Sequence, residues 1–305
     1  MHGDVARPGK RRVPDAEVRI FILSSPPNLL SEWSFLLICP AKRCKTIKSR
    51  KEDYMDRKLL GVLILFMVVS FVAGAVNCLA EDKVYINGID ANFPPFAYVD
   101  KNGVPDGFDV KSVDWIAKEM GFKVRHQPMD WDGIIPSLRA KKIDMVASGM
   151  SITDKRKEQV NFTIPYWRIA QVIVAPKDCT LSVDELLSKG NKVGVQRGTT
   201  EANWMKENLI QKGKDFKLVE YDSAPLAIED VLNGRIVAAA MDDAPAKDAM
   251  RKKPVKIVGT FGMPSEDFGY AVRKEDTELL NTMNEGLKKL MASPYWEELK
   301  TIYKP

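Results

Sequence analysis

Residues 59–80 contain no charged side chain, and this segment divides the chain into two parts of different character. Arg57 and Lys58 precede it, and Cys78 and Ala80 place small residues near its end. A short basic start, an apolar stretch and small residues before a cleavage point are typical of a secretory signal peptide. We therefore predict a signal peptide over residues 55–80, cleaved after Ala80, and an exported body that follows.

Two other interpretations of this region remain open. The segment is long enough to span a bilayer, so it could be an uncleaved anchor. A lipoprotein attached through Cys78 is disfavoured, because Asn77 occupies a position that requires a small residue. Met55 is a natural start, and we expect residues 1–54 to be a non-native or disordered N-terminal extension without a function of its own.

Charge and composition exclude several classes of function. Residues 1–80 carry 13 basic and 7 acidic side chains, whereas residues 81–305 carry 33 and 34. The body has no basic surplus, which argues against a nucleic-acid partner. It contains one cysteine, Cys179, and one histidine, His126. These are too few for a common zinc site or an evident catalytic triad, and we expect no metal, no cofactor and no catalytic residue.

From residue 81 onward, strand-like and helix-like stretches alternate, which indicates an α/β fold. A turn at Asn102-Gly103 predicts a hairpin, and Ser182 with Glu185 has the pattern of a capping box. The strands are expected at residues 84–89, 123–129, 143–147, 171–175, 192–196, 236–241 and 268–272. The helices are expected at residues 109–120, 134–138, from 201, 224–232, 245–250, 275–291 and 295–303.

Five segments, in order, resemble the family-3 periplasmic amino-acid-binding proteins. They span most of residues 83–305, and a shorter match, GFD at residues 107–109, lies between the first two. The segments are residues 88–96 (GIDANFPPF), 129–138 (MDWDGIIPSL), 148–156 (SGMSITDKR), 193–200 (VGVQRGTT) and 234–242 (GRIVAAAMD).

This resemblance implies a two-lobe, type II periplasmic binding protein fold, in which two crossing strands form the hinge. We place the first lobe at residues 81–175 plus 269–305 and the second at residues 176–268. The resemblance also implies a monomer that binds a free amino acid in the periplasm, between two closing lobes. It would deliver that amino acid to the permease of an ABC transporter in the inner membrane.

The chemistry of an amino acid suits several of these residues. Its carboxylate matches the planar fork of Arg156, which can donate two parallel hydrogen bonds. Arg156 lies in a predicted loop that enters a helix, and Thr199 and Thr200 lie in another. Backbone N–H groups at such helix starts favour an anion.

The remaining roles are implied by the resemblance. N–H groups of Ser151 and Thr200 would bind the carboxylate, while the Gly149 carbonyl and Asp242 would accept from the ammonium, with Asp243 as the fallback. Aromatic residues would sandwich the ligand side chain, and polar residues at the far end would select it. The candidate ligand-binding residues are Asp90, Phe93, Trp131, Ser148, Gly149, Ser151, Arg156, Gln196, Thr199, Thr200, Met241 and Asp242.

Several candidates also have a structural interpretation: Asp90 could cap a turn, and Thr199 and Thr200 could merely cap the helix that they precede. Arg156 could lie on a solvated helix face, and Asp242 could be an N-cap. Phe93 and Trp131 could be core aromatics. Cys179 is most simply a lone, at least partly buried thiol.

Two alternative functions remain open. One is a cyclohexadienyl dehydratase acting on prephenate or arogenate, for which no general acid beyond the binding aspartates is evident. The other is the ectodomain of a membrane sensor. The aromatic pair and the absence of a basic residue at the far end favour a polar uncharged or aromatic ligand, and Asp90 leaves cationic ligands open.

Overall fold

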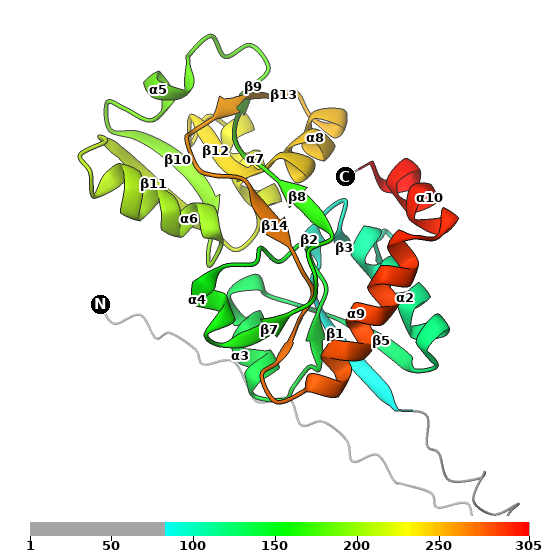
Figure 1. The fold of residues 1–305 in the computed structure, drawn as a ribbon. Coiled ribbons are helices and arrows are strands. Elements are labelled where there is room, and N and C mark those ends of the chain that lie inside the picture. The colour runs from blue at the N-terminus through cyan, green and yellow to red at the C-terminus, as the bar shows by residue number, and fades with distance from the viewer. Residues whose placement is uncertain (1–82, 305) are drawn as a thin grey trace, which may run out of the picture. The chain divides into compact units, whose positions relative to one another are not determined.

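Residues 83–304 are the part of the chain that the computed structural model describes. They form two α/β lobes, each built on a five-stranded sheet, and Figure 1 shows the connecting strands β8 and β14 between them. The predicted extension (residues 1–54) and signal peptide (residues 55–80) lie outside the described residues. Within residues 83–304, no helix combines the length and the apolar character needed to cross a membrane.

The first lobe contains both ends of the described chain. Its sheet has the order β5-β1-β6-β15-β7, in which β1 pairs in parallel with β5 and β6, and β15 runs antiparallel between β6 and β7. The strands are Val84–Asp90 (β1), Lys123–Met129 (β5), Met145–Val146 (β6), Val160–Phe162 (β7) and Ala271–Arg273 (β15).

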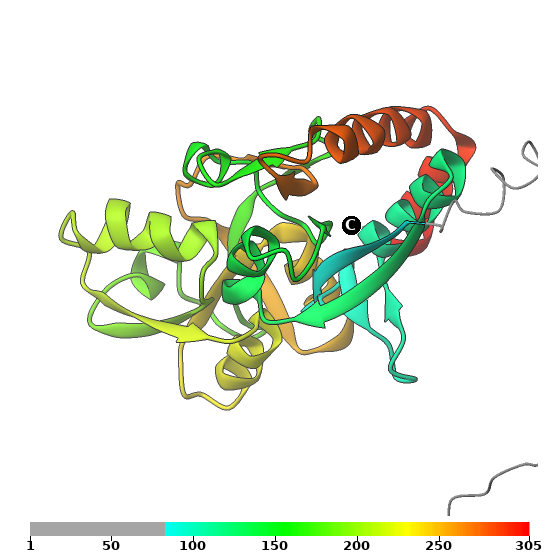
Figure 2. The same ribbon diagram turned by 90° about the horizontal axis from the view of Figure 1, so that it is seen from below.

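Helices cover this sheet through apolar stripes. Val113 and Ile116 lie on the buried face of α2, which ends where Gly121 adopts a left-handed conformation with φ of 75°, as the sequence predicts. Figures 1 and 2 show α2, α9 and α10 together on one side of the lobe. The helices are Phe108–Met120 (α2), Ile134–Arg139 (α3), Thr277–Met291 (α9) and Pro294–Tyr303 (α10).

The second lobe has a sheet of order β11-β10-β12-β9-β13. Its strands are Gln171–Pro176 (β9), Asn191–Gln196 (β10), Phe216–Tyr221 (β11), Ala238–Asp242 (β12) and Val255–Thr260 (β13). Its helices are Val183–Leu186 (α5), Thr200–Met205 (α6) with the π-helical Lys206–Ile210, Ala224–Leu232 (α7) and Asp243–Lys252 (α8). The capping box of Ser182 and Glu185 is present at the start of α5, which confirms that prediction.

Short elements lie between and beside the two sheets. The strands β8 and β14 pair antiparallel with each other, and they are the two crossing strands that the resemblance implies. Close to this crossing, a three-stranded sheet includes the predicted hairpin, formed by β3 and β4. The short elements are Asn92–Phe93 (β2), Ala97–Val99 (β3), Pro105–Asp106 (β4), Trp167–Ile169 (β8), Glu266–Phe268 (β14), the 3-10 turn Trp131–Gly133 and Asp154–Lys157 (α4).

The structure corrects two sequence predictions. We placed residues 171–175 in the first lobe, but β9 lies between β12 and β13 in the second sheet, because the chain already crosses between lobes at β8. We also expected one strand at residues 268–272. The chain instead leaves β14 at Phe268 and enters β15 at Ala271, with Gly269 packed against Ile152 where it turns.

Candidate functional site

A cavity lies where the two lobes meet, at the carboxyl ends of several strands. Asp90 ends β1, Gln196 ends β10 and Asp242 ends β12. In α/β sheets this is the edge at which ligands commonly bind. The residues that line the cavity are Asp90, Phe93, Trp131, Gly149, Ser151, Arg156, Gln196, Thr199, Thr200, Glu201 and Asp242. All of them except Glu201 are candidates from the sequence.

Arg156 is held rigidly in the cavity wall. Thr153 caps α4 by accepting a hydrogen bond from the Arg156 backbone N–H. The guanidinium donates to the carbonyl oxygens of Ser151 at 3.0 Å and Gly198 at 3.4 Å, and lies 5.4 Å from the centre of the Trp131 ring. Burial lowers the pKa of Arg156, but a guanidinium stays charged in proteins. The result is a fixed cation that can bind a carboxylate, and not a solvated helix face.

The start of α6 forms the opposite wall. Thr199 is the N-cap, and its Oγ1 accepts from the Ala202 N–H and donates to the Gln196 carbonyl at 2.8 Å. Helix α6 therefore begins at Thr200, on the cavity wall. The partial positive charge of a helix N-terminus adds to that of Arg156 and favours an anion here.

Asp242 brings negative charge to the same cavity. It is buried at the end of β12, and its Oδ1 accepts a hydrogen bond from Gln171 Nε2 at 2.9 Å. Asp242 occupies the N-cap position of α8, but its side chain makes no capping bond. Burial, with the neighbouring Glu201 carboxylate, raises the pKa of Asp242 well above its ordinary value. Among residues 83–304 Asp242 forms no ion pair, and a buried carboxyl group of this kind is suited to an ammonium group.

Gly149 brings the backbone close to Phe93. Its φ is +61°, and a Cβ at this position would lie 2.3 Å from Phe93 Cε1, so glycine is required on both grounds. The Gly149 N–H donates to Asp109 Oδ2 at 2.7 Å, and the Tyr166 hydroxyl donates to the same oxygen at 2.7 Å. Burial raises the pKa of Asp109 to about 7. Asp109 therefore fixes the Gly149 peptide from behind the cavity.

At the far end of the cavity, a hydrogen bond joins the two lobes. Gln196 Nε2 donates to Asp90 Oδ2 at 2.7 Å, and Asp90 Oδ1 accepts from the Asn92 N–H at 2.9 Å. Burial raises the pKa of Asp90. Ser148 does not line the cavity; its Oγ accepts from the Asp90 N–H at 2.9 Å, so it orients the strand end behind Asp90.

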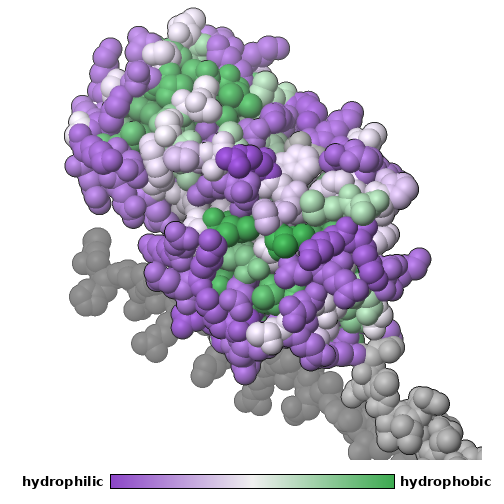
Figure 3. All heavy atoms as spheres, viewed as in Figure 1, coloured by the Kyte–Doolittle hydropathy of each residue, from purple (hydrophilic) through white to green (hydrophobic). Residues whose placement is uncertain are grey.

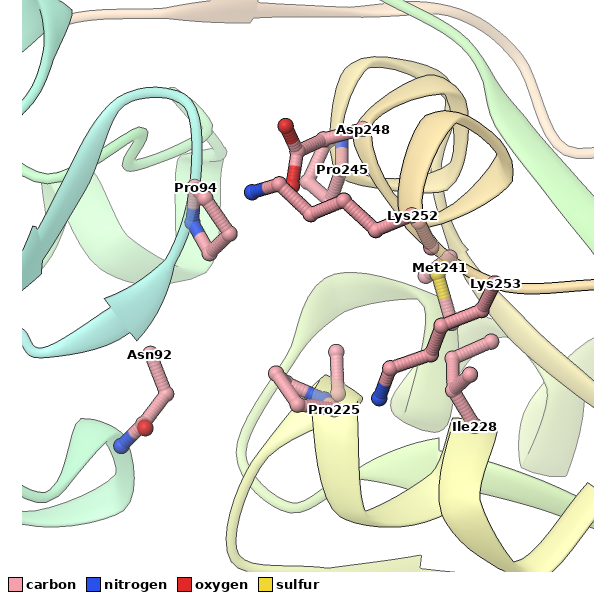
Figure 4. A pocket seen from close by; sticks show the side chains of 11 residues that line it. Asn92, Pro94, Pro225, Ile228, Met241, Pro245, Asp248, Lys252 and Lys253 are labelled. Atoms are coloured by element: carbon pink, nitrogen blue, oxygen red, sulfur yellow. The ribbon is translucent and has the colours of Figure 1, made fainter.

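Met241 differs from its predicted position. Neighbouring residues on a strand face opposite sides, so Met241 points away from the cavity that Asp242 enters. It packs with Ile228 in the apolar cluster of α7 and lines a second pocket between the lobes. Figure 4 shows Pro94 across this pocket from Lys252, beside which Asp248 lies.

Three polar residues near the cavity were missed by sequence reasoning: Glu201, Gln171 and Glu266. Glu201 lies in the first turn of α6, where an acidic residue is an ordinary helix-start feature. Gln171 lies in a strand that we predicted to belong to the first lobe, and Glu266 lies in β14, where we expected no strand before residue 268. No signal in the local sequence marks any of them as part of a site.

Cys179 and His126, whose side chains are of types that commonly bind metals, do not line the cavity. Cys179 is a partly buried free thiol, which confirms its prediction. His126 contacts Asn87 and Asp114 through its two ring nitrogens. Among residues 83–304, no group of histidine, cysteine and acidic side chains is arranged to hold a metal ion.

Comparisons with known proteins agree with this architecture. Residues 85–304 match the model of the bacterial extracellular solute-binding proteins, family 3. A probable histidine-binding protein of Neisseria gonorrhoeae is 33% identical over 225 residues, 72% of this chain and 83% of that protein. An L-arginine-binding protein of Pseudomonas aeruginosa is 32% identical over 80% of this chain and 95% of its own.

A solved structure is similar over the same region. It is an ancestral amino-acid-binding protein described as a precursor of cyclohexadienyl dehydratase, with a TM-score of 0.67 and 36% identity over 72% of this chain and 95% of that chain. The resemblance drawn from the sequence is thereby confirmed. The chain belongs to the bacterial extracellular solute-binding proteins of family 3.

Proposed function

We propose that this protein binds one free amino acid between its two lobes. The observation that carries the proposal is that a buried guanidinium, Arg156, and a buried carboxyl group, Asp242, line the same cavity from different lobes. An amino acid presents a carboxylate and an ammonium on one carbon, and this pair of residues is complementary to it. Close relatives named for binding histidine and arginine support the proposal.

Binding is expected to close the lobes. The carboxylate joins Arg156 and the start of α6, while the ammonium joins Asp242 and the Gly149 carbonyl. Since these groups come from both lobes, the ligand makes all its contacts only when the lobes are together. It therefore shifts the population toward the closed state. No bond is made or broken in this cycle.

The charge of the cavity bears on the choice of ligand. The sequence favours a polar uncharged or aromatic side chain, but the cavity wall holds three carboxylates, Asp90, Glu201 and Asp242, and one cation, Arg156. We therefore propose a ligand with a cationic side chain directed at Asp90. Phe93 and Trp131, which line the same cavity, suit a flat guanidinium or imidazolium ring.

A thermal-shift screen tests the proposal. The purified protein is unfolded and refolded to remove bound ligand, then heated with each common amino acid. At about 100 times its dissociation constant, a ligand adds about 2.7 kcal/mol to stability. We expect shifts for L-arginine, L-lysine or L-histidine that are lost in Arg156→Ala. A shift only for L-glutamine or aromatic amino acids would contradict the cationic preference, and no shift for any amino acid would contradict the function.

Delivery and location follow from family membership. We propose that the protein acts as a monomer in the periplasm, after cleavage of its signal peptide at Ala80, and hands its ligand to an ABC transporter permease. Figure 3 shows an apolar patch on each lobe within a mostly hydrophilic face, and such patches suit protein contacts. N-terminal sequencing of exported protein checks the cleavage, and a retained segment would support the sensor alternative.

One observation favours a second candidate, the dehydratase-type enzyme. Burial raises the pKa of Glu201 to about 7, so the cavity holds a carboxyl group able to act as a general acid near neutral pH. The named relatives above are binding proteins, and we rank catalysis second. Turnover of prephenate or arogenate by the purified protein, lost in Glu201→Gln, would reverse that ranking.

A further inference from the structure

Glu201 belongs to a continuous polar network that reaches Asp242. The Thr200 hydroxyl donates to Glu266 Oε2 at 2.7 Å, and its oxygen lies 3.3 Å from Glu201 Oε2. Gln171 Nε2 lies between the other two carboxylates, 3.4 Å from Glu266 Oε2 and 2.9 Å from Asp242 Oδ1. The network thus links α6, β14, β9 and β12, and Glu201 and Asp242 both line the ligand cavity.

This network has many hydrogen-bond acceptors and few donors. Three carboxylates share the amide of Gln171 and the hydroxyl of Thr200. The Gln171 carbonyl oxygen, Oε1, is buried and has no hydrogen-bond partner among residues 83–304. Arg156 is the nearby cation, but its guanidinium donates to the carbonyls of Ser151 and Gly198. Buried acceptors without donors are costly, and two of these acceptors, Glu201 and Asp242, line the cavity, so it favours a ligand group with several N–H bonds.

An α-ammonium is such a group, with a positive charge and three N–H donors. The charged groups that face Glu201 are Asp242 from β12, Glu266 from β14 and Arg156 from α4. In addition to burial, Glu201 raises the pKa of Asp242, and Glu266 raises the pKa of both, so without ligand the Glu201–Asp242 pair is more stable with a proton than without one. The arrival of an ammonium reverses this balance, because the ionised carboxylate then has a cation beside it.

Resting on the proposed amino-acid function, we propose that Glu201 is a second carboxylate for the ligand's α-ammonium, next to Asp242, and that the Glu201–Asp242 pair loses its proton when the ligand binds. The carboxyl O–H bond within the pair breaks, its proton passes to the solvent, and both carboxylates accept hydrogen bonds from the ammonium. The amino acid itself stays a zwitterion. Glu201 is thereby a residue that selects α-amino acids over carboxylic acids without an amino group.

Two further points agree with this assignment. Burial raises the pKa of Glu201 to about 7 and that of Asp242 well above its ordinary value, so the pair holds the proton to be released near neutral pH. The Glu201 carboxyl group also lies at the start of α6, where the backbone N–H of Glu201 stabilises the ionised form. Both protonation states are therefore accessible in the folded protein.

Isothermal titration calorimetry measures the proton directly. L-Arginine and L-glutamine are titrated into the refolded protein at about pH 7, in phosphate and in Tris, whose ionisation enthalpies differ. The Glu201–Asp242 pair holds a proton at this pH, so we expect release of about half a proton to one proton per ligand. The arginine analogue without the α-amino group should release none.

Glu201→Gln separates this role from a structural one. It should abolish most of the proton release and weaken L-arginine binding about tenfold or more, since a charge-assisted hydrogen bond is lost. Its melting temperature should not fall, because the amide cannot ionise and so carries no penalty for a charge in this buried position. Glu207→Gln, an exposed position in the following turn, should leave both proton release and affinity unchanged.

The outcomes separate this inference from the proposed function. If L-arginine or L-glutamine binds without releasing a proton, or if Glu201→Gln binds and releases protons like the native protein, the role of Glu201 is overturned and amino-acid binding stands. If neither ligand binds the native protein, both the role of Glu201 and the binding of these amino acids are overturned.

Discussion

Arg156 shows how a single side chain is prepared for its ligand. Two carbonyl oxygens and the Trp131 ring hold the guanidinium in one orientation, so little side-chain entropy remains to be lost on binding. A lysine keeps the charge but loses the planar fork. We expect Arg156→Lys to weaken binding of the ligand by about ten- to a hundredfold, measured by calorimetry, with little change in melting temperature. Native affinity in this variant would show that the fork is not used.

Asp109 gives a prediction about pH. A carboxyl group whose pKa is higher in the folded than in the unfolded state binds more protons when folded. Its stabilising effect is therefore complete below about pH 4 and lost as the pH rises through about 7. Asp109→Asn should flatten the fall in urea-unfolding stability between about pH 5 and about pH 8, by on the order of a few kcal/mol. The exposed variant Asp178→Asn should retain the native slope, and an unchanged slope in Asp109→Asn would contradict this role.

At the residue scale, the sequence predicted most of the site and missed its acidic network. Arg156, Asp242 and Gly149 lie in segments with a distinctive order of residues, so their convergence could be predicted from the resemblance. The role of Glu201 could not be predicted in this way, because an acidic residue in the first turn of a helix is common. Its burial becomes evident only when β14 brings Glu266 to Thr200, a contact between residues far apart in the chain.

At the scale of elements, α9 depends on a glycine for its contact with α2. A Cβ at Gly286 would lie 2.5 Å from Ile116 Cγ2, and the β-branched Ile116 has little freedom to move away. Alanine gains about 1 kcal/mol of helix propensity over glycine, but overpacking costs about 1–3 kcal/mol. We expect Gly286→Ala to be destabilising in urea unfolding. The exposed helix variant Asn281→Ala should be neutral or stabilising, and a stabilised Gly286→Ala would contradict the tight contact.

Helices were predicted more completely than strands. The periodic apolar residues of α2, α7 and α9 and their end signals lie within single segments, which local sequence reports well. The strands β11 and β13 were not predicted at all. Their burial alternates irregularly along the strand, because each is at an edge of the second sheet. A short edge strand is stabilised by pairing with a neighbouring strand, and the sequence of the edge strand does not show which strand that is.

At the scale of the whole described body, closure of the two lobes depends on a close contact between them that does not involve the ligand. Gly198 of the second lobe has φ of +77°, and a Cβ there would lie 3.2 Å from Asp132 Cβ of the first lobe. Gly198→Ala requires a left-handed backbone at a non-glycine residue and a shift of Asp132 by a few tenths of an ångström, so it should weaken ligand binding in calorimetry. Unchanged affinity would contradict the importance of this contact. Gly213→Ala, with φ of +93° and open space around it, controls for backbone strain alone.

By contrast, the ion pair between the two lobes should contribute little to ligand affinity. Arg197 lies 3.7 Å from Asp132 Oδ2, and both side chains are nearly half exposed. Solvent screens such a pair, so Asp132→Asn is expected to change ligand affinity by less than about threefold in calorimetry. A larger loss would indicate that exposed charges, and not the buried cavity, hold the lobes together.

The lobe boundary also belongs to this scale. The hydrophobic strand β9 could equally have joined either sheet from its sequence, and only its pairing with β12 and β13 decides the matter. The two lobes enclose two pockets between them. One is the ligand cavity, and the other is lined by Pro94, Met241 and Lys252.

The central claim is that an amino acid lies in the first of these pockets, with its carboxylate at Arg156 and its ammonium at Asp242. A crystal structure of the protein with its best-binding amino acid tests this most directly. We expect a ligand carboxylate in two hydrogen bonds with the Arg156 guanidinium and an ammonium within hydrogen-bond distance of Asp242. A ligand seated instead in the pocket of Pro94, Met241 and Lys252, or bound with its polarity reversed, would contradict it.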